Sequence, residues 1–99
     1  MEIRFSKASY DDLDEIEDYL LNEWNDKVLD DFNLRLEHCL KLITDGIAVF
    51  QKYEDTNYHK LLITKHNTLI YSLEQNILTV HRVLQNFQDP DDNQKSLKS

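Results

Sequence analysis

The chain has 99 residues, a formal net charge of −8, and one residue each of glycine, proline and cysteine. This length fits a single domain, and the scarcity of glycine excludes glycine-rich phosphate loops and dinucleotide-binding motifs. A lone thiol, Cys39, forms neither an internal disulfide nor a multi-cysteine zinc site, which favours a reducing, cytoplasmic location. The sequence has no apolar signal region at its start and no apolar run long enough to span a membrane.

The negative charge is concentrated in the first half of the chain. Residues 1–45 contain thirteen acidic and five basic side chains, whereas residues 46–99 contain six of each. Because binding to nucleic acid depends on neutralising phosphates, this distribution argues against direct nucleic-acid binding. Any surface for an anionic ligand is therefore expected in the second half.

The chain begins with a predicted strand and helix. Residues 1–6 alternate apolar and polar side chains, which predicts a short strand with Ile3 and Phe5 on its buried face. Ser9 is the predicted N-cap of the helix that follows. Glu17 falls inside the apolar arc of this helix, so we expect its carboxylate to meet a base or a tyrosine hydroxyl. The apolar stripe, at helical spacing, consists of Leu13, Ile16, Leu20 and Trp24, where the helix is expected to end.

A second predicted helix follows a short turn. Asn25 and Asp26 indicate its start, and Gly46 ends it by supplying a left-handed conformation. So short a turn makes the two helices antiparallel neighbours. Leu34 lies opposite the apolar stripe, where a partner surface would use it. The stripe itself consists of Leu29, Phe32, Leu36, Leu40 and Ile43, with Cys39 at its edge.

The second half of the chain changes to strand-like patterning. Residues 58–64, 67–73 and 76–87 are rich in β-branched, leucine and aromatic side chains, and short polar breaks separate them. This spacing predicts two successive β-hairpins. Residues 47–57 are mixed in composition, and no element is predicted there.

These elements predict one α+β domain. Their order is β-α-α-β-β-β, which gives an antiparallel sheet with a helical hairpin packed on one face. We expect the first strand to pair with the last, at residues 77–84, because the hairpin connections leave that strand free. The domain spans residues 1–90, and residues 91–99 are expected to form a flexible polar tail.

Several positions match a known pattern. Asp12, Leu13, Ile16, Tyr19 and Leu20, followed by Trp24, fit a D-L-x-x-I-x-x-Y-[IL] helix opening with a later tryptophan. Phe32 and Leu36 fall at core positions of the second helix. They are followed in order by an I-Y pair at Ile70-Tyr71, a spaced apolar pair at Ile77 and Val83, and a closing D-P at Asp89-Pro90. This ordered set, over about residues 2–90, resembles the RelE/ParE toxin superfamily of toxin–antitoxin and plasmid-stabilisation modules, and is nearer to its ParE side.

The resemblance implies a bacterial toxin held inactive by a cognate antitoxin that wraps over the sheet and helices. ParE-like members inhibit DNA gyrase, whereas RelE-like members cleave mRNA in the ribosomal A site. RelE-like cleavage needs clustered basic residues on the strands, which hold the RNA and stabilise developing charge. This chain departs from that pattern, because residues 85–88 read Gln-Asn-Phe-Gln where many members have a histidine and an arginine.

The candidate target-binding residues are basic side chains of the strand region. His81 and Arg82 together would grip a phosphate, although neighbours on a strand usually point to opposite faces. The lysines are equally well explained as edge-strand charges that block aggregation. The complete candidate set is Lys60, Lys65, His81 and Arg82.

We assign no catalytic residue and expect no cofactor or metal. Within the acidic run from Asp11 to Asp18, four acids fall on the solvent side of the helix, which is the usual place for such charges, namely Asp11, Asp14, Glu15 and Asp18. His38 and Cys39 are neighbours on a helix and point in different directions, so they form no metal-binding or nucleophilic pair.

The candidate antitoxin-binding residues lie on the sheet. Helices on one face leave the other face and the edges of the sheet open to a partner segment. That segment should be basic where it passes the exposed acids Asp14, Glu15 and Asp18, and apolar where it reaches the sheet. The apolar contacts predicted there are Leu62, Leu69 and Leu84.

The sequence thus favours a ParE-like toxin that binds a macromolecular target such as DNA gyrase. Two alternatives stay open. One is a non-toxic interaction module of the same fold. The other, the single enzymatic alternative, is a ribosome-dependent mRNA endonuclease with a degenerate active site.

Overall fold

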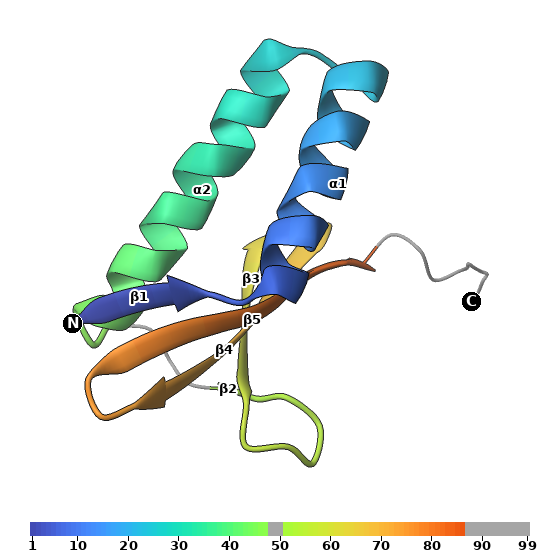
Figure 1. Cartoon of the computed structure of the whole chain (residues 1–99). Coiled ribbons are helices and arrows are strands. Elements are labelled where there is room, and N and C mark those ends of the chain that lie inside the picture. Colours follow the sequence, from blue (N-terminus) through green and yellow to red (C-terminus); the bar gives the residue numbers. More distant parts are fainter. Residues whose placement is uncertain (48–50, 87–99) are drawn as a thin grey trace.

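The computed structural model describes residues 1–47 and 51–86, which form a five-stranded sheet with two helices packed on one face (Figure 1). The predicted α+β class and the helical hairpin are confirmed. Residues 87–99, which include the predicted tail and the Asp89-Pro90 motif, lie outside the described residues. The elements are β1 (Glu2–Phe5), α1 (Lys7–Glu23), α2 (Asp26–Thr44), β2 (Gln51–Lys52), β3 (His59–Thr64), β4 (Asn67–Glu74) and β5 (Ile77–Gln85).

The strands lie in the order β1-β5-β4-β3-β2. As predicted, β1 pairs with β5, with Ile3 opposite Leu78 and Phe5 opposite Val80. This pairing is parallel, so the sheet is mostly rather than wholly antiparallel. A parallel pair needs a long crossover connection, which the helical hairpin and the intervening strands provide. Because β1 is an edge strand, Ile3 is 39% exposed rather than buried.

The β3–β4 and β4–β5 hairpins are those predicted from the sequence. Gln75 and Asn76, which join β4 to β5, have φ values of 51° and 65°, as a two-residue hairpin turn requires. Strand β2 was not predicted. It contains two residues that pair with His59 and Lys60, and backbone pairing with β3 creates it without any apolar alternation of its own.

The helix ends follow from capping chemistry. Ser6, not Ser9, is the N-cap of α1, because its Oγ accepts the Ser9 N–H at 3.1 Å. Asn25 caps α2 as expected, with its side-chain oxygen 3.0 Å from the Val28 nitrogen. At the other end of α2, Gly46 has a φ of 75° and its N–H donates to the Ile43 carbonyl. This left-handed residue ends α2.

The core lies between the helical hairpin and the sheet. Both predicted helical stripes contribute to it, and burial raises the pKa of the Cys39 thiol, which keeps it protonated. The buried cluster consists of Ile16, Phe32, Leu36, Cys39, Ile43, Ile63, Leu69, Tyr71, Leu78, Val80 and Val83.

Two helical predictions were wrong. Trp24, predicted as a core residue, is 63% exposed, because it is the C-cap of α1 and its backbone leaves the helical path. Glu17 is exposed rather than buried, because the core reaches only a narrow strip of α1 around Ile16. Leu34 lies on the outer face of α2 as expected, with 63% of its surface exposed. Neither described helix is long and apolar enough to cross a membrane.

The corner between β1 and α1 is fastened to β5 by side chains. Ser6 donates its N–H to the Val80 carbonyl at 3.0 Å and its hydroxyl to the His81 carbonyl at 2.9 Å. Further along α1, Asp12 accepts the Val83 N–H at 2.9 Å. β1 ends at Phe5, so the Asp12 carboxylate takes the place of a strand along this part of the β5 edge.

We expect the Asp12→Ala variant to lose about 2 kcal/mol of unfolding free energy, because it leaves charge-assisted hydrogen bonds unmade. Asp12→Asn should lose less, since the amide oxygen still accepts the Val83 N–H. Asp14→Ala, an exposed acid on the same helix, is the control and should change stability little. Denaturant unfolding followed by circular dichroism measures all three, and equal losses for Asp12→Ala and Asp14→Ala would contradict the assignment.

Candidate functional site

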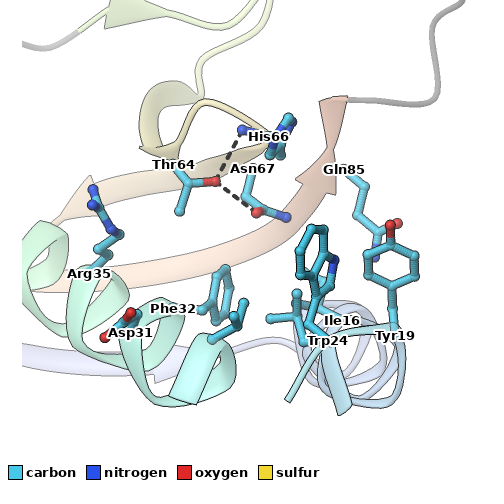
Figure 2. Close-up of a pocket in the computed structure, with 12 residues that line it drawn as sticks. Ile16, Tyr19, Trp24, Asp31, Phe32, Arg35, Thr64, His66, Asn67 and Gln85 are labelled. Carbon is cyan, nitrogen blue, oxygen red and sulfur yellow. Dashed lines mark hydrogen bonds between the residues drawn. The ribbon is translucent and has the colours of Figure 1, made fainter. Parts of the chain in front are cut away.

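An apolar groove lies between the helical hairpin and the β3–β4 end of the sheet (Figure 2). Its volume is about 380 Å³, which is in the range of pockets that bury a small ligand or an anchoring side chain. Side chains from α1, α2, the β3–β4 turn and the end of β5 line it. The apolar and aromatic part of the lining consists of Ile16, Tyr19, Leu20, Trp24, Val28 and Phe32.

The opposite wall of the groove is polar. The Thr64 hydroxyl lies 2.9 Å from Asn67 Oδ1 and accepts the His66 N–H at 3.0 Å (Figure 2). Gln85, at the end of β5, lies near Tyr19 and Trp24 in the same view. The groove therefore has an apolar side on the helices and a polar side at the β3–β4 turn.

Sequence patterns alone did not reveal this groove. Trp24 and Phe32 were assigned to core stripes, which is correct for Phe32 only. The one sequence signal that could have indicated the groove was a tryptophan at the predicted end of the first helix, beside a short turn. Tyr19 and Trp24 are 40% and 63% exposed, so the groove presents aromatic surface to a partner.

The face of the sheet away from the helices holds a cross-strand cluster. The rings of Tyr58 and His81 are stacked, with centroids 4.3 Å apart and planes 18° from parallel. Ser72 Oγ lies 2.8 Å from His81 Nε2, so the two side chains share a hydrogen bond. Tyr58 immediately precedes β3, Ser72 lies in β4 and His81 in β5, so the cluster connects the start of β3 with the two neighbouring strands.

His81 has an altered proton affinity. Its burial lowers its pKa below the ordinary value of 6.5, and the negative charge of Glu74 partly opposes this shift. The imidazole is therefore neutral near neutral pH, and as a neutral group it offers no positive charge to a phosphate.

Arg82 is bound by an acid from α1. Its Nε and Nη2 lie 2.7 and 2.9 Å from the two carboxylate oxygens of Asp12, a bidentate pair. These hydrogen bonds and the Asp12 charge raise the pKa of the Arg82 guanidinium. The side chains of His81 and Arg82 thus point in different directions, His81 on the open face and Arg82 towards α1. This agrees with the expectation that neighbours on a strand point to opposite faces, and not with a shared phosphate site.

The two candidate lysines are also separate. Lys60 is half-buried in β3, in register with Ile70 of β4, which is in turn opposite Arg82. Lys65 is exposed in the β3–β4 turn. By register, Lys60 therefore shares a cross-strand row with Arg82, whereas Lys65 lies beyond the end of β3.

The three candidate antitoxin contacts divide between the two faces. Leu62 and Leu84 are both in register with Thr68, so they lie in one row on the open face. Leu62 is 60% exposed and Leu84 is half-buried. Leu69 is fully buried in the core beneath the helices, so its side chain offers no surface to a partner. Successive side chains of β4 point to opposite faces of the sheet, and Leu69 is on the face that the helices cover.

Within residues 1–47 and 51–86, no group of three potential metal ligands is found.

Comparison with known proteins identifies the fold. No protein-family model and no curated protein sequence matches the chain. The chromosomal ParDE TA system of P. aeruginosa matches with a TM-score of 0.67 and 13% identity, over 86% of this chain and 95% of that chain. A copper-bound mutant toxin from Helicobacter pylori matches with a TM-score of 0.63 and 16% identity, over 89% of this chain and 97% of that chain. The YoeB dimer from Staphylococcus aureus matches with a TM-score of 0.58 and 21% identity, over 83% of this chain and 92% of that chain.

The chain therefore has the fold of RelE/ParE-type toxins. YoeB has also been crystallised with YefM as a toxin–antitoxin complex. Structures of both ParE and YoeB match over most of the chain, so the likeness does not resolve the predicted preference for ParE.

We expect the free energy of unfolding to fall as the pH drops below about 6.5, where the unfolded chain binds a proton at His81 more readily than the folded one. His81→Gln should remove this part of the loss. His38→Gln, an exposed histidine on α2, is the control and should leave it in place. Unfolding curves at about pH 7 and about pH 5 test this, and an unchanged pH dependence in His81→Gln would contradict it.

Proposed function

We propose that this chain is the toxin of a type II toxin–antitoxin module. The support is the shared fold, which covers most of this chain and nearly all of each matching toxin. The groove and the open sheet face add two surfaces of the kind that protein partners use.

We further propose that the toxin acts by binding a macromolecular target, such as DNA gyrase, rather than by cutting RNA. The observation that carries this is the Arg82–Asp12 pair, which engages the one arginine among the candidate residues. Burial lowers the pKa of His81, which keeps the imidazole neutral, and Lys65 lies in the turn between β3 and β4. An RNA-cleaving site needs several cations aimed at one phosphate, and the candidate set does not supply them.

The cognate antitoxin is proposed to occupy the groove and the Leu62–Leu84 row. Exposed aromatic rings such as Trp24 and Tyr19 are typical anchors of protein interfaces. The outer faces of α1 and α2 carry many exposed acids, so the part of the antitoxin that crosses them should be basic. Such charges mainly steer association, whereas apolar contacts hold the complex.

Induced expression of the chain alone in a bacterium should arrest growth, and co-expression of the antitoxin from a neighbouring reading frame should restore it. Arrest with DNA-damage signals supports inhibition of gyrase. Arrest with a stop in translation supports the RNA endonuclease alternative, and growth without arrest supports the non-toxic interaction module.

Primer extension on translating ribosomes should detect no cleavage at A-site codons, because Asp12 engages Arg82. Robust cleavage that disappears in Arg82→Ala but persists in Lys7→Ala, an exposed cation at the start of α1, would place Arg82 in an active site and overturn the proposal.

Trp24→Ala should weaken antitoxin binding by about thirtyfold, the loss expected when an aromatic anchor worth about 2 kcal/mol is removed. Ile47→Ala, an exposed apolar residue after α2 and outside the groove lining, should change affinity little. Charge reversal at Asp14, Glu15 and Asp18 should slow association and reduce its salt dependence. Equal effects of Trp24→Ala and Ile47→Ala on the dissociation constant would exclude the groove.

A further inference from the structure

The outer edge of β1 is open. This strand lies at one end of the sheet and pairs with β5 along its inner side (Figure 1). The N–H groups of Glu2 and Ser6 donate to carbonyls of the β5 side at 3.2 and 3.0 Å, so alternate residues of β1 turn their main chain towards β5. The main-chain N–H and C=O groups of Ile3 and Phe5 therefore point outward. Within residues 1–47 and 51–86, neither residue makes a backbone hydrogen bond outside the sheet.

The charges of β1 balance each other. Arg4 Nε lies 2.6 Å from Glu2 Oε2, and both side chains are exposed. Residues 6–45, by contrast, contain twelve acidic and four basic side chains. Edge strands are commonly protected from pairing by a proline, a bulge or an unbalanced charge, and β1 contains none of these. It is thus a neutral strip in the acidic half of the chain, with free hydrogen-bonding groups along it.

Apolar surface accompanies this edge on the side of the helices. Met1, Ile3 and Tyr10 are 52%, 39% and 57% exposed. The ring of Tyr10 in α1 lies against that of Phe5, with centroids 5.5 Å apart. A strand that paired with β1 would cover these side chains, and its burial of apolar surface would add to the new main-chain hydrogen bonds.

We propose that β1 pairs with β1 of a second copy of this chain, antiparallel about a two-fold axis at Ile3, so that two five-stranded sheets become one continuous sheet. In a two-fold dimer, each copy contributes the same surface, and a strand can meet its own copy in this way only in the antiparallel direction. Strand addition of this kind gives affinity through main-chain hydrogen bonds and specificity through side chains.

Charge selects the register of this pairing. Only outward-facing residues can stand opposite one another along the new ladder, so the possible registers differ by steps of two residues. With Ile3 opposite Ile3 of the second copy, each Glu2 faces an Arg4 and each Met1 faces a Phe5. A slip of two residues in one direction places Glu2 opposite Glu2, and a slip in the other places Arg4 opposite Arg4. Opposite charges across strands are stabilising and like charges are destabilising, so β1 complements itself in the register centred on Ile3.

The contact is small, which sets the expected affinity. A pairing of about five residues a side buries less than the roughly 1,200 Å² that marks stable interfaces. We therefore expect a weak dimer whose population rises with protein concentration. This pairing does not depend on the proposed function, because it involves neither a target nor an antitoxin.

Sedimentation velocity of the full chain over a concentration series should show a monomer–dimer equilibrium. Arg4→Glu and Glu2→Arg each bring like charges together and should each raise the dimer dissociation constant by about tenfold. An equimolar mixture of these two variants should dimerise again, because every acid of one then faces a base of the other. The double variant Glu2→Arg, Arg4→Glu should likewise recover the dimer. Lys27→Glu, an exposed cation at the start of α2, changes the net charge as Arg4→Glu does and should have little effect.

Cross-linking tests the register. The Cα atoms of a hydrogen-bonded antiparallel pair are about 5.5 Å apart, which suits a disulfide, so Ile3→Cys should form a covalent dimer on mild oxidation. Leu34→Cys, at an exposed position of α2, should cross-link much more slowly. The unaltered chain should not cross-link, because Cys39 is buried. Far-UV circular dichroism checks that each variant is folded.

Three results would overturn the proposal. One is a chain that stays monomeric up to about 1 mM, the concentration at which even very weak pairing is populated. Another is an equal effect of Arg4→Glu and Lys27→Glu, since net charge and not register would then control association. The third is cross-linking of Leu34→Cys as fast as that of Ile3→Cys. If the chain is monomeric and Arg4→Glu instead weakens antitoxin binding, the edge belongs to the antitoxin and not to a second copy.

Discussion

The carboxylate of Asp12 is the interaction on which the arrangement of this molecule depends. β1 covers only the first half of the β5 edge, and beyond it Asp12 accepts hydrogen bonds from the Val83 N–H and from two guanidinium nitrogens of Arg82. An unpaired backbone donor at this position would cost free energy, and one side chain of α1 satisfies it. The same contact fixes the direction of α1 relative to the sheet, and α2 follows because the connecting turn is short.

Once the hairpin is placed, the sheet has two different surfaces. On one face, the helices cover the core but leave a groove where α1 ends at Trp24 and β3 turns into β4. On the other face, Tyr58 at the start of β3 stacks on His81, which also meets Ser72, and Leu62 and Leu84 lie in one row. The first surface is apolar with an aromatic rim, and the second is mixed. The two faces of the sheet thus differ in chemistry.

The Asp12 contact also bears on function, because it engages a cation that a toxin of the RNA-cleaving type would need. Arg82 stabilises the fold in the described structure, and it would have to leave two hydrogen bonds to grip a phosphate with the same nitrogens. Asp12 is one of the many acids in the first half of the chain, but the net charge alone did not indicate which acid pairs with which base. Pairing between residues 70 positions apart is a property of the folded chain.

Local patterns in the amino-acid sequence specify the elements and their order. Strand alternation, helical stripes and turn residues are short-range signals, so the helices, the hairpins and the pairing of β1 with β5 were predictable without coordinates. Contacts between residues distant in the chain decided the rest, including Ser6 rather than Ser9 as the N-cap, β2, the burial of Leu69, and the pairing of Arg82 with Asp12. Trp24 shows the reason most clearly. Its spacing matched the core stripe, but the helix ends one residue earlier, so the side chain lies at the rim of the groove instead of inside the core.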